Sequence, residues 1–597
     1  MVHGVADSGN KSNPFTTGRT HQEATALRGL ERAAMSGVGY EEPETRYHAH
    51  IIKLLLSALP SRNEIHRLWQ AVTDSEKYHL SYYHHRSSCT SSSAGFPPEF
   101  GLSQPIQHPV ILARRMLIFA TALQGLPPVV DLGLSKNHVT IMDEVVEAVI
   151  SLVNVNDALM GSLEALDNLM LQSMFHMNCG LLKRSWMTLR QAVMCAQILG
   201  LHRAGHHRFT VLDAAREYEP ETMWHEIVYM ERVGSLLLGL PTSTGMTVLV
   251  RLDLTKDIPH EKYLSTVLGN VAARILDRNQ IQSPQQALDT TKSIDKEMIS
   301  ISEQMPSSYW RPLDFTGINK ASADAFGEVQ RAFSHASYYT LIIQLHTPYM
   351  LCPTYPTQTA YSRMACVNAS REILSHEVAL RSFTAITAFC RLSEFLALIA
   401  GVTLMLAHAS SHCSQQAGNL LSHQRLRDRA LVERVLECLE FMADLQQDLP
   451  AVRCIALLKD LLYIEEDAAH NHANLNPSGE QERSMMIVRM PFYGNVKISG
   501  RGIASVTLPG SEQEVGQSEG LHIGGIGSVR IVRPTTQAVK QVDTNVPPDG
   551  AAFSAYDSDV LPVQYQHNFD PSLDDWAFQG IDTAFFESLM REAGTST

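Results

Sequence analysis

Apolar side chains recur at helical spacing through most of the chain, from about residue 108 to residue 465. One face of a central helix is formed by residues three or four positions apart, namely Trp186, Leu189, Val193, Ala196 and Gly200. Arg190 is predicted to lie elsewhere on the surface of this helix. Pro, Gly and polar clusters interrupt the pattern near residues 205–220, 241–260, 303–320 and 347–360. The pattern predicts an all-α fold, a large helical bundle or solenoid-like body.

Two helices in the middle of this region have well-marked ends. Gly200 followed by Leu201 predicts a Schellman motif, in which the glycine is left-handed and the leucine packs back on the last turn. The next helix starts near Thr222, is apolar almost all round, and is stopped by Gly239 and Pro241. A helix of this kind lies inside a bundle, so its charged residues need polar partners there.

The texture of the sequence changes at both ends of the helical region. The start is polar and rich in Gly, Ser and Thr, whereas short strand-like runs between Gly- and Ser-rich turns follow the last helices. An early helix is predicted from Ser61 and Glu64, which form a capping box. The chain is therefore divided into a disordered leader (1–45), a helical body (46–470), a β-rich extension (471–545) and an acidic, aromatic tail (546–597).

Charge and cysteine content narrow the functional classes. The 597 residues include 48 Lys and Arg against 62 Asp and Glu, which gives a formal net charge of −14. Binding to phosphates requires clustered basic residues, and the longest basic groups here are pairs, so no DNA-binding arm is expected. The nine cysteines form no C-x-x-C pair, which favours buried thiols in a reducing compartment over disulfides or a zinc site.

No membrane or secretory segment is predicted. The first twenty residues lack the apolar core of a signal peptide. The longest apolar run, residues 395–407, would span only about 20 Å as a helix, which is short of the ~30 Å core of a bilayer. We therefore expect a buried helix at this position, in a soluble intracellular chain.

Five blocks of sequence carry a resemblance to a known family. The first combines "LGLHR", a tryptophan, an acidic-Arg pair and "LGLP", through Gly200, Leu201, His202, Arg203, Trp224, Glu231, Arg232 and Pro241. The others are "YYTLIIQLHTPYML", "CVNASREIL", "FCRLSEFLALIAGVTLMLAH" and "RMPFYGNVKISGRG". In this order, over roughly residues 50–500, the blocks resemble the middle homology region of fungal-specific transcription factors, in the branch that controls secondary-metabolite gene clusters.

The chain departs from this family at two places. The tryptophan helix of the family usually begins with consecutive arginines and carries a second tryptophan, where this chain has Glu221, Thr222 and His225. Most family members also begin with a six-cysteine, two-zinc DNA-binding cluster and a short coiled coil, whereas no cysteine precedes Cys89 here. Either the gene never had this module or the chain is incomplete, so zinc-dependent DNA binding is not carried over.

The histidines near residue 200 are candidates for binding. His202 and Arg203, at a helix C-terminus, are expected to complement the macrodipole and cap carbonyls, with an anionic ligand or a partner as the alternative. His202, His206 and His207 lie close enough in sequence to suggest a metal. Glycines break the helix there and no acidic residue completes the set, so we expect a solvated loop and no metal.

A second candidate is enzymatic. "GQSEG" around Ser518 matches the nucleophile elbow of α/β-hydrolases, and Asp543 and His567 follow in the order that this fold uses. The elbow requires a buried strand before the serine and a helix after it, and neither flank has that pattern. We therefore expect no enzyme activity and no cofactor.

The tail has the composition of an activation segment. Residues 569–590 combine aromatic and acidic side chains and contain no Lys or Arg; the candidate contact residues are Trp576, Phe578, Phe585 and Phe586. Acidic residues keep such aromatics solvated until they meet a hydrophobic groove on a coactivator, where the segment folds as a helix. A terminal helix docked on its own bundle is an equally weighted alternative.

The resemblance implies a nuclear transcription regulator, an activator of a secondary-metabolite gene cluster. Without a basic or zinc module of its own, it would reach promoter DNA only indirectly, through a DNA-binding transcription factor, while the tail recruits a coactivator. A repressor or inhibitory scaffold of the same family and, as a weaker hypothesis, a serine hydrolase stay open. The chain could also form a homo- or heterodimer, which the sequence leaves open. Nuclear location is inherited from the resemblance, because the sequence contains no recognisable import signal.

Overall fold

A computed structural model places most of the helical region. The residues that it describes are 43–74, 108–126, 131–203, 208–245 apart from 215 and 217, 260–319, 322–350, 356–383, 391–412, 421–446, 449–473, 485–490, 494–499, 502–507, 521–523 and 527–532. The predicted leader, except for its last three residues, and the whole acidic, aromatic tail lie outside these ranges. The division of the chain into four parts therefore stays a prediction.

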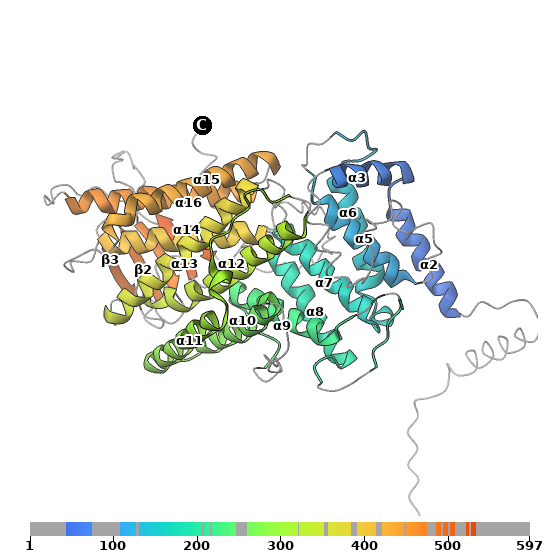
Figure 1. Ribbon diagram of the computed structural model, residues 1–597, viewed down its shortest axis with the longest axis horizontal. Helices are drawn as coiled ribbons and strands as arrows, with labels where there is room; N and C mark the ends of the chain where they lie inside the picture. Colours follow the sequence, from blue (N-terminus) through green and yellow to red (C-terminus); the bar gives the residue numbers. More distant parts are fainter. Residues whose placement is uncertain are drawn as a thin grey trace, which may run out of the picture.

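An N-terminal group of helices lies at one side of the molecule, on the right in Figure 1. It consists of α2 (Pro43–Ala58), α3 (Arg62–Asp74), α5 (Pro109–Leu123), α6 (His138–Val149), the single turns η1 (Ile150–Asn154) and η2 (Asp157–Leu159), and α7 (Leu163–Asn178). His108, Asn137 and Ser162 start α5, α6 and α7 by accepting a hydrogen bond from a backbone N–H of the first turn. The core of this group is almost entirely aliphatic, and α5 is buried along most of its length.

The predicted capping box at the start of α3 is confirmed. The Oε2 atom of Glu64 accepts hydrogen bonds from the backbone N–H and the hydroxyl of Ser61, at 3.0 and 2.7 Å. The hydroxyl of Ser61 and the backbone N–H groups that the carboxylate binds lower the pKa of Glu64 to about 2. The preceding helix α2 was not singled out by the sequence pattern, and it begins three residues before the predicted start of the helical body.

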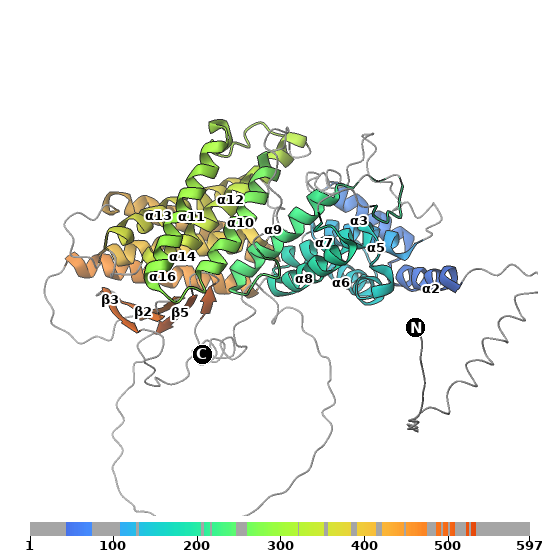
Figure 2. The ribbon, with the colours of Figure 1, turned by 90° about the horizontal axis from the view of Figure 1, so that it is seen from below.

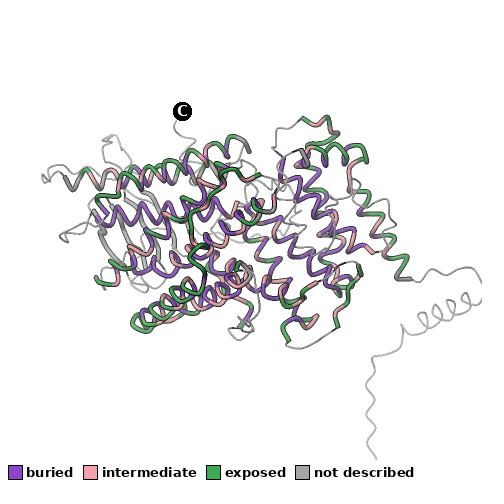
Figure 3. Tube along the Cα trace, viewed as in Figure 1, coloured by how far each residue is buried: buried purple, intermediate pink, exposed green. Residues whose placement is uncertain are grey.

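A longer series of helices continues through the middle of the molecule to its other side (Figure 1). The series is α8 (Leu182–Leu199), α9 (Pro220–Leu238), α10 (His260–Arg278), α11 (Pro284–Gln304), η4 (Ser307–Trp310), α12 (Ala323–Met350), α13 (Pro356–Phe383), α14 (Arg391–His412), η6 (Ser422–Gln424), α15 (Arg425–Gln446) and α16 (Leu449–Ala473). Buried residues line the inner faces of both groups, while the outer faces of helices such as α11 and α15 are exposed (Figure 3). The predicted all-α class is confirmed for the helical body.

The apolar run at residues 395–407 forms most of α14, at the centre of the largest core. By length and composition α14 could cross a membrane, but 94% of its most apolar stretch is buried inside the fold. Its apolar surface is used for packing against α12, α13 and α16. The prediction of a buried helix at this position is confirmed.

The "HTPY" sequence corrects one sequence-based expectation. The sequence predicted an interruption of the helical pattern near residues 347–360, but α12 continues to Met350, with Pro348 inside the helix. Proline has no N–H to donate to the carbonyl four residues earlier, which belongs to Gln344. Arg278 of α10, itself buried, donates to that carbonyl at 3.2 Å and to the carbonyl of Leu345 at 3.1 Å. A side chain from another helix thus satisfies the carbonyl that Pro348 leaves free, and the helix persists.

Five strands follow the helices: β1 (Met485–Met490), β2 (Gly494–Ser499), β3 (Gly502–Thr507), β4 (Leu521–Ile523) and β5 (Gly527–Val532). They form an antiparallel sheet with the order β3-β2-β1-β5-β4. The register of β2 and β3 shifts between Lys497 and Ile498. The labelled strands lie below α14 and α16 in Figure 2.

Candidate functional site: the α8–α9 junction

The C-terminus of α8 is closed by the predicted Schellman motif. Gly200 has a φ of 90°, in the left-handed region that glycine adopts without strain. Its N–H donates to the carbonyl of Gln197 at 3.1 Å, and the N–H of Leu201 donates to the carbonyl of Ala196 at 2.9 Å. Leu201 is buried. These are the two hydrogen bonds and the apolar contact that define the motif, so the prediction is confirmed.

The helix α9 ends in the same way. Gly239 has a φ of 66°, and the N–H of Leu240 donates to the carbonyl of Ser235 at 2.8 Å. Pro241 follows at once and prevents the helix from continuing. The chain therefore turns sharply into residues 241–245, which lie against the helices that precede them.

Trp224, near the start of α9, is buried and packs against the end of α8. It belongs to an apolar cluster that joins α7, α8 and α9 and contains Leu166, Met170, Val193 and Leu201. The ring of His202 lies 6.2 Å from the ring of Trp224, while His202 and Arg203 are both exposed. The helix end itself is closed by backbone N–H groups, so the predicted capping role of these two side chains stays a prediction.

Glu231 is fully buried and holds the loop after α9 to the helix. The backbone N–H of Ser243 and the hydroxyl of Thr242 donate to its two carboxylate oxygens, at 2.8 and 2.7 Å. Arg190 of α8 donates to the same carboxylate at 3.1 Å and to the carbonyl of Pro241 at 3.0 Å. Ser235, one turn further along α9, is within 3.3 Å. The carboxylate therefore connects α8, α9 and the loop.

Arg232 is also fully buried but points to different partners. Its guanidinium donates to the hydroxyl of Thr244 at 3.1 Å, to the carbonyl of Gly245 at 2.9 Å and to the side-chain oxygen of Asn270 at 3.0 Å. Burial lowers the pKa of Arg232 from its ordinary value, although the carboxylates of Glu231 and Asp277 oppose this shift. Arg232 thus joins α9 to the loop and to α10.

The two adjacent charges act as a clamp, which we define as Glu231 and Arg232 with the loop residues 242–245. Each residue binds a different part of the loop, and their other partners include Arg190 of α8 and Asn270 of α10. The clamp connects three helices, α8, α9 and α10, through the loop that follows α9. It satisfies the polar groups that a buried acidic-Arg pair brings into the core.

Two features of the junction were not predicted. Arg190 lies off the buried face of α8, as expected, with its side chain 34% exposed, but its ion pair with buried Glu231 and the position of its guanidinium 5.0 Å from the centre of the Trp186 ring were not predicted. Trp186 in turn donates to Ser235 at 2.8 Å. The hydroxyl-rich sequence "PTSTG" directly after the helix was the available signal for the partners of the clamp. Neighbouring helix faces decide such contacts, and helical spacing alone does not specify them.

A second polar cluster links α13, α14 and α15. Asp428 accepts hydrogen bonds from Arg371 at 2.7 Å and lies 2.7 Å from Nε2 of His408. Asp428 and His408 are buried. Burial raises the pKa of Asp428, but its hydrogen bonds with His408 and Arg371 lower the pKa by more. The pKa of Asp428 therefore lies below its ordinary value. Arg371 lies in the "CVNASREIL" block, which is helical as predicted.

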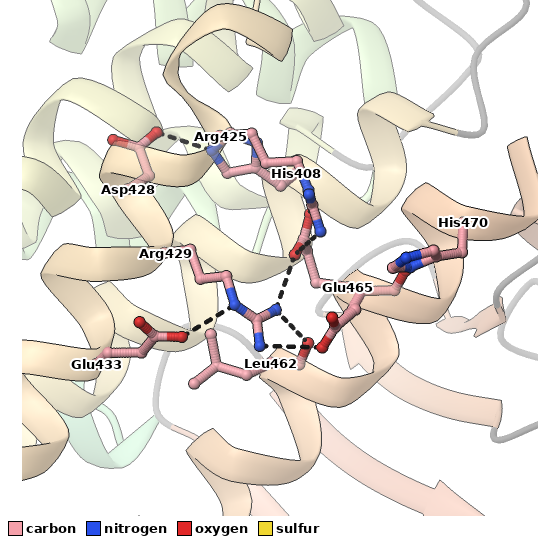
Figure 4. Close-up of polar contacts among 9 residues, drawn as sticks. His408, Arg425, Asp428, Arg429, Glu433, Leu462, Glu465 and His470 are labelled. Carbon is pink, nitrogen blue, oxygen red and sulfur yellow. Dashed lines mark hydrogen bonds and ion pairs between the residues drawn. The ribbon is translucent and has the colours of Figure 1, made fainter. Parts of the chain in front are cut away.

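The outer face between α15 and α16 carries a third set of ionic contacts (Figure 4). Arg425 binds Glu465 at 2.5 Å, and Arg429 binds Glu433 at 3.0 Å, Glu466 at 3.1 Å and the carbonyl of Leu462 at 3.0 Å. Unlike the clamp, most of these groups face solvent on at least one side. We call this set the α15–α16 network.

A serine, a histidine and an aspartate also lie in series within the helical body. His346 is 3.1 Å from the hydroxyl of Ser362 through Nδ1 and 3.1 Å from Asp295 through Nε2. Ser362 and His346 are fully buried on α13 and α12, so a substrate has no access to the hydroxyl. The arrangement is a hydrogen-bond chain between α11, α12 and α13.

Several candidates lie outside the described residues. These are His206 and His207, the "GQSEG" serine Ser518 with Asp543 and His567, and the tail residues Trp576, Phe578, Phe585 and Phe586. Within the described ranges, no group of three or more His, Cys, Asp or Glu side chains is placed to hold a metal ion. The expectations about metal, catalysis and activation at these positions therefore stay predictions.

The fold and the junction together define a helical body whose motif residues position helices, and comparison with known proteins identifies its class. The protein named Probable transcription factor gsfR1, from Penicillium aethiopicum, is 40% identical over 584 residues, which cover 92% of this chain and 84% of that protein. The Dehydrocurvularin biosynthesis regulator of Alternaria cinerariae is 31% identical, over 91% of this chain and 81% of that protein. The protein of the same name from Aspergillus terreus is 32% identical, over 82% of this chain and 74% of that protein.

The chain belongs to the family of fungal transcription factors that includes these regulators of secondary-metabolite biosynthesis. No protein-family model matches the chain. The resemblance to fungal transcription factors that regulate secondary-metabolite biosynthesis is thus confirmed by these relatives. The relatives bear the names of regulators, not of enzymes.

Proposed function

We propose that the chain is a nuclear activator of a fungal secondary-metabolite gene cluster. The observation that carries this proposal is the 40% identity to a named transcription factor over 92% of the chain. Two further relatives are named for the biosynthesis that they regulate. The acidic and aromatic composition of residues 569–590 supports activation rather than repression.

The helical body serves as the scaffold of this regulator. The clamp and the Asp428 cluster tie consecutive helices together through buried polar contacts. Such contacts favour one arrangement of helices over others, because a packing that breaks them leaves buried charges without partners. A fixed body can present a partner-binding face.

The chain reaches promoters through a DNA-binding partner. Phosphate contacts require basic groups that are free to face DNA. Within the described helices, many arginines are instead engaged by carboxylates; examples are Arg190, Arg371, Arg381, Arg425 and Arg429. A gel-shift measurement with the purified chain at physiological salt tests this step, and specific nanomolar binding to a target promoter by the chain alone would contradict it.

A transcriptome comparison tests the regulatory function. The strain with the gene deleted and a strain that overexpresses it are compared under conditions in which the protein is made. A block of neighbouring biosynthetic genes is expected to fall in the first strain and to rise in the second. Transcripts that rise on deletion would favour a repressor or inhibitory scaffold, and no change in either strain would contradict regulation altogether.

The activating role of the tail is tested separately. Residues 546–597 are fused to a heterologous DNA-binding module and assayed on a reporter. The fusion is expected to raise reporter expression, and replacing Trp576, Phe578, Phe585 and Phe586 by alanine is expected to abolish the effect, because the aromatic side chains supply the contact area. An inactive parent fusion would favour the inhibitory scaffold.

A further inference from the structure

The helix α8 carries an exposed apolar stripe. Met187, Met194 and Ile198 are 57%, 51% and 77% exposed, and they lie seven and four positions apart. That spacing places all three on one face of the helix. The opposite face of α8 is buried against α7 and α9 through residues such as Leu189 and Val193. The stripe is therefore surface that the helical body does not use for its own packing.

The neighbouring turn adds to this apolar surface. Gln191, which lies between Met187 and Met194 on α8, donates from its side chain to the carbonyl of Asn154 at 2.7 Å. This bond holds the segment that joins η1 and η2 beside the helix, and Val155 in that segment is 59% exposed. Methionine side chains adapt to varied apolar partners, so a surface of this composition is suited to an amphipathic ligand.

The charges around the stripe are mainly basic. The helix α8 contains Lys183, Arg184 and Arg190 and has no Asp or Glu along its whole length. Lys183 lies one turn before Met187, and Arg203 follows the end of the helix. Three acidic groups are near: Asp157 on the side of η2, Asp143, which interacts with Arg184, and Glu231, which is buried and engaged by Arg190. An acidic ligand with apolar side chains would therefore meet complementary charge here.

We propose that the stripe formed by Met187, Met194 and Ile198 binds the chain's own acidic, aromatic segment, residues 569–590. This segment contains five aromatic side chains, at Phe569, Trp576, Phe578, Phe585 and Phe586, and has no Lys or Arg. Its aromatic residues cover the methionines, and its carboxylates face Lys183 and Arg203, which are exposed. A second copy of α8 would fit less well, because it would bring two sets of basic residues together.

The connection is long enough for this contact. The residues 533–568, which are 36 in number, separate β5 from the segment. An extended chain of that length reaches about 120 Å, whereas the longest helices of the body, with 28 residues, span about 42 Å. Tethering to the same polypeptide also raises the effective concentration of the segment at the stripe to the order of millimolar.

Docking would keep the aromatic residues away from a coactivator. The same side chains would contact either the stripe or the partner, so the two contacts exclude each other. This regulatory consequence rests on the proposed activating role of the tail, whereas the docking itself does not. A DNA-binding partner or a coactivator that releases the segment would then switch the regulator on.

Hydrogen–deuterium exchange of the full chain tests the docking. The amides of residues 569–590 are compared in the wild-type chain and in the double variant Met194→Glu/Ile198→Glu. Both side chains are largely exposed, so the fold is expected to persist, and circular dichroism checks this. The matched control is Val452→Glu/Tyr463→Glu on α16, where the side chains are 52% and 64% exposed.

The segment is expected to be protected in the wild-type chain and in the control, and to exchange at least tenfold faster in the α8 variant. Equal exchange in all three proteins, or loss of protection in the control alone, would overturn the proposal. Protection that rises with protein concentration alongside a dimeric mass would also overturn it, in favour of a second copy. A reporter measurement on the α8 variant separates the docking proposal from the proposed activating role of the tail. If residues 569–590 lose protection in this variant but reporter transcription is unchanged, the result supports docking and contradicts an activating tail.

Discussion

The clamp at the α8–α9 junction and the α15–α16 network use the same chemical groups in different surroundings. At the clamp, Glu231 and Arg232 are fully buried, and each has several hydrogen-bond partners. On the outer face, the side chains of Glu433 and Glu466, two partners of Arg429, are 50% and 47% exposed, and the Arg434 side chain is 58% exposed. Water competes for the exposed groups and can replace a lost partner, but it cannot do so at the clamp. Burial therefore decides how much each contact matters.

The replacement Arg232→Ala gives the largest expected effect. It leaves the hydroxyl of Thr244, the carbonyl of Gly245 and the side-chain oxygen of Asn270 without their buried donor and opens a cavity between α9 and α10. Buried acceptors that lose their donor, together with the cavity, cost about 3–5 kcal/mol of unfolding free energy. Chemical denaturation followed by circular dichroism checks this. A loss below about 1 kcal/mol would mean that the clamp is solvated in the way that the outer network is.

Acidic pH is expected to have the next largest effect, because buried histidines make the unfolding free energy depend on pH. Burial lowers the pKa values of His176, His335 and His376 to about 4, 3 and 4. Histidines of the unfolded chain bind protons below about pH 6.5 while these three stay neutral in the fold, so stability is full above pH 6.5 and falls as the pH falls. Each histidine is expected to cost about 2 kcal/mol between pH 6.5 and 5.

The variant His376→Gln isolates one of these contributions. It removes one titrating group, so the decrease in unfolding free energy between pH 6.5 and 5 should shrink by about 2 kcal/mol, whatever the stability of the variant at pH 7. Urea unfolding at pH 7, 6 and 5 measures the decrease in both proteins. An unchanged pH dependence would show that His376 is protonated in the folded state.

The end of α8 is expected to be less sensitive. The replacement Gly200→Ala places a side chain in the left-handed region at a φ of 90°, which costs about 1 kcal/mol. The space around Gly200 is open, so backbone strain and not a steric clash is the cause. Gly200→Asn should cost less than the alanine variant, because asparagine tolerates this conformation better. Equal losses in the two variants, measured by thermal unfolding, would contradict the role assigned to the backbone.

The smallest effects belong to the α15–α16 network. Arg429→Ala removes contacts with Glu433 and Glu466, whose carboxylates stay in contact with water, and a longer contact of 3.5 Å with buried Glu465. Glu465 keeps Arg425 as its partner, so the expected loss is below about 1 kcal/mol. For Arg434→Ala, on the same helix, no measurable change is expected. Salt should weaken the Arg429 contribution while the clamp keeps its own. A loss for Arg429→Ala as large as that for Arg232→Ala would remove the distinction between the two regions.

Local rules predicted much of the fold, and contacts between distant helices account for most of what was missed. The ends at Gly200 and Gly239 and the capping box at Ser61 depend on a few adjacent residues, so the sequence was sufficient. The position of Arg190 depends on Glu231, 41 residues away, and the continuation of α12 past Pro348 depends on Arg278. Helical spacing gives the direction of a side chain on its own helix, but not what it meets.

The same distinction applies to the candidate site. The motif residues of α8 and α9 were identified from a family resemblance, and the structure then gave each buried charge its partners. The exposed stripe on α8 was not predicted, because helical spacing favours the apolar face that is buried and says nothing of a second one. Ser518 and the tail residues lie outside the described residues, so their roles still rest on sequence alone.

Chromatin immunoprecipitation with an epitope-tagged chain tests the central claim most directly. The tagged protein is expressed from its own locus, and the recovered DNA is sequenced alongside DNA from an untagged strain. The account predicts enrichment at the promoters of a block of neighbouring biosynthetic genes whose transcripts fall when the gene is deleted. Recovery no greater than in the untagged strain, under conditions in which the protein is made, would contradict action at promoters, either direct or through a partner.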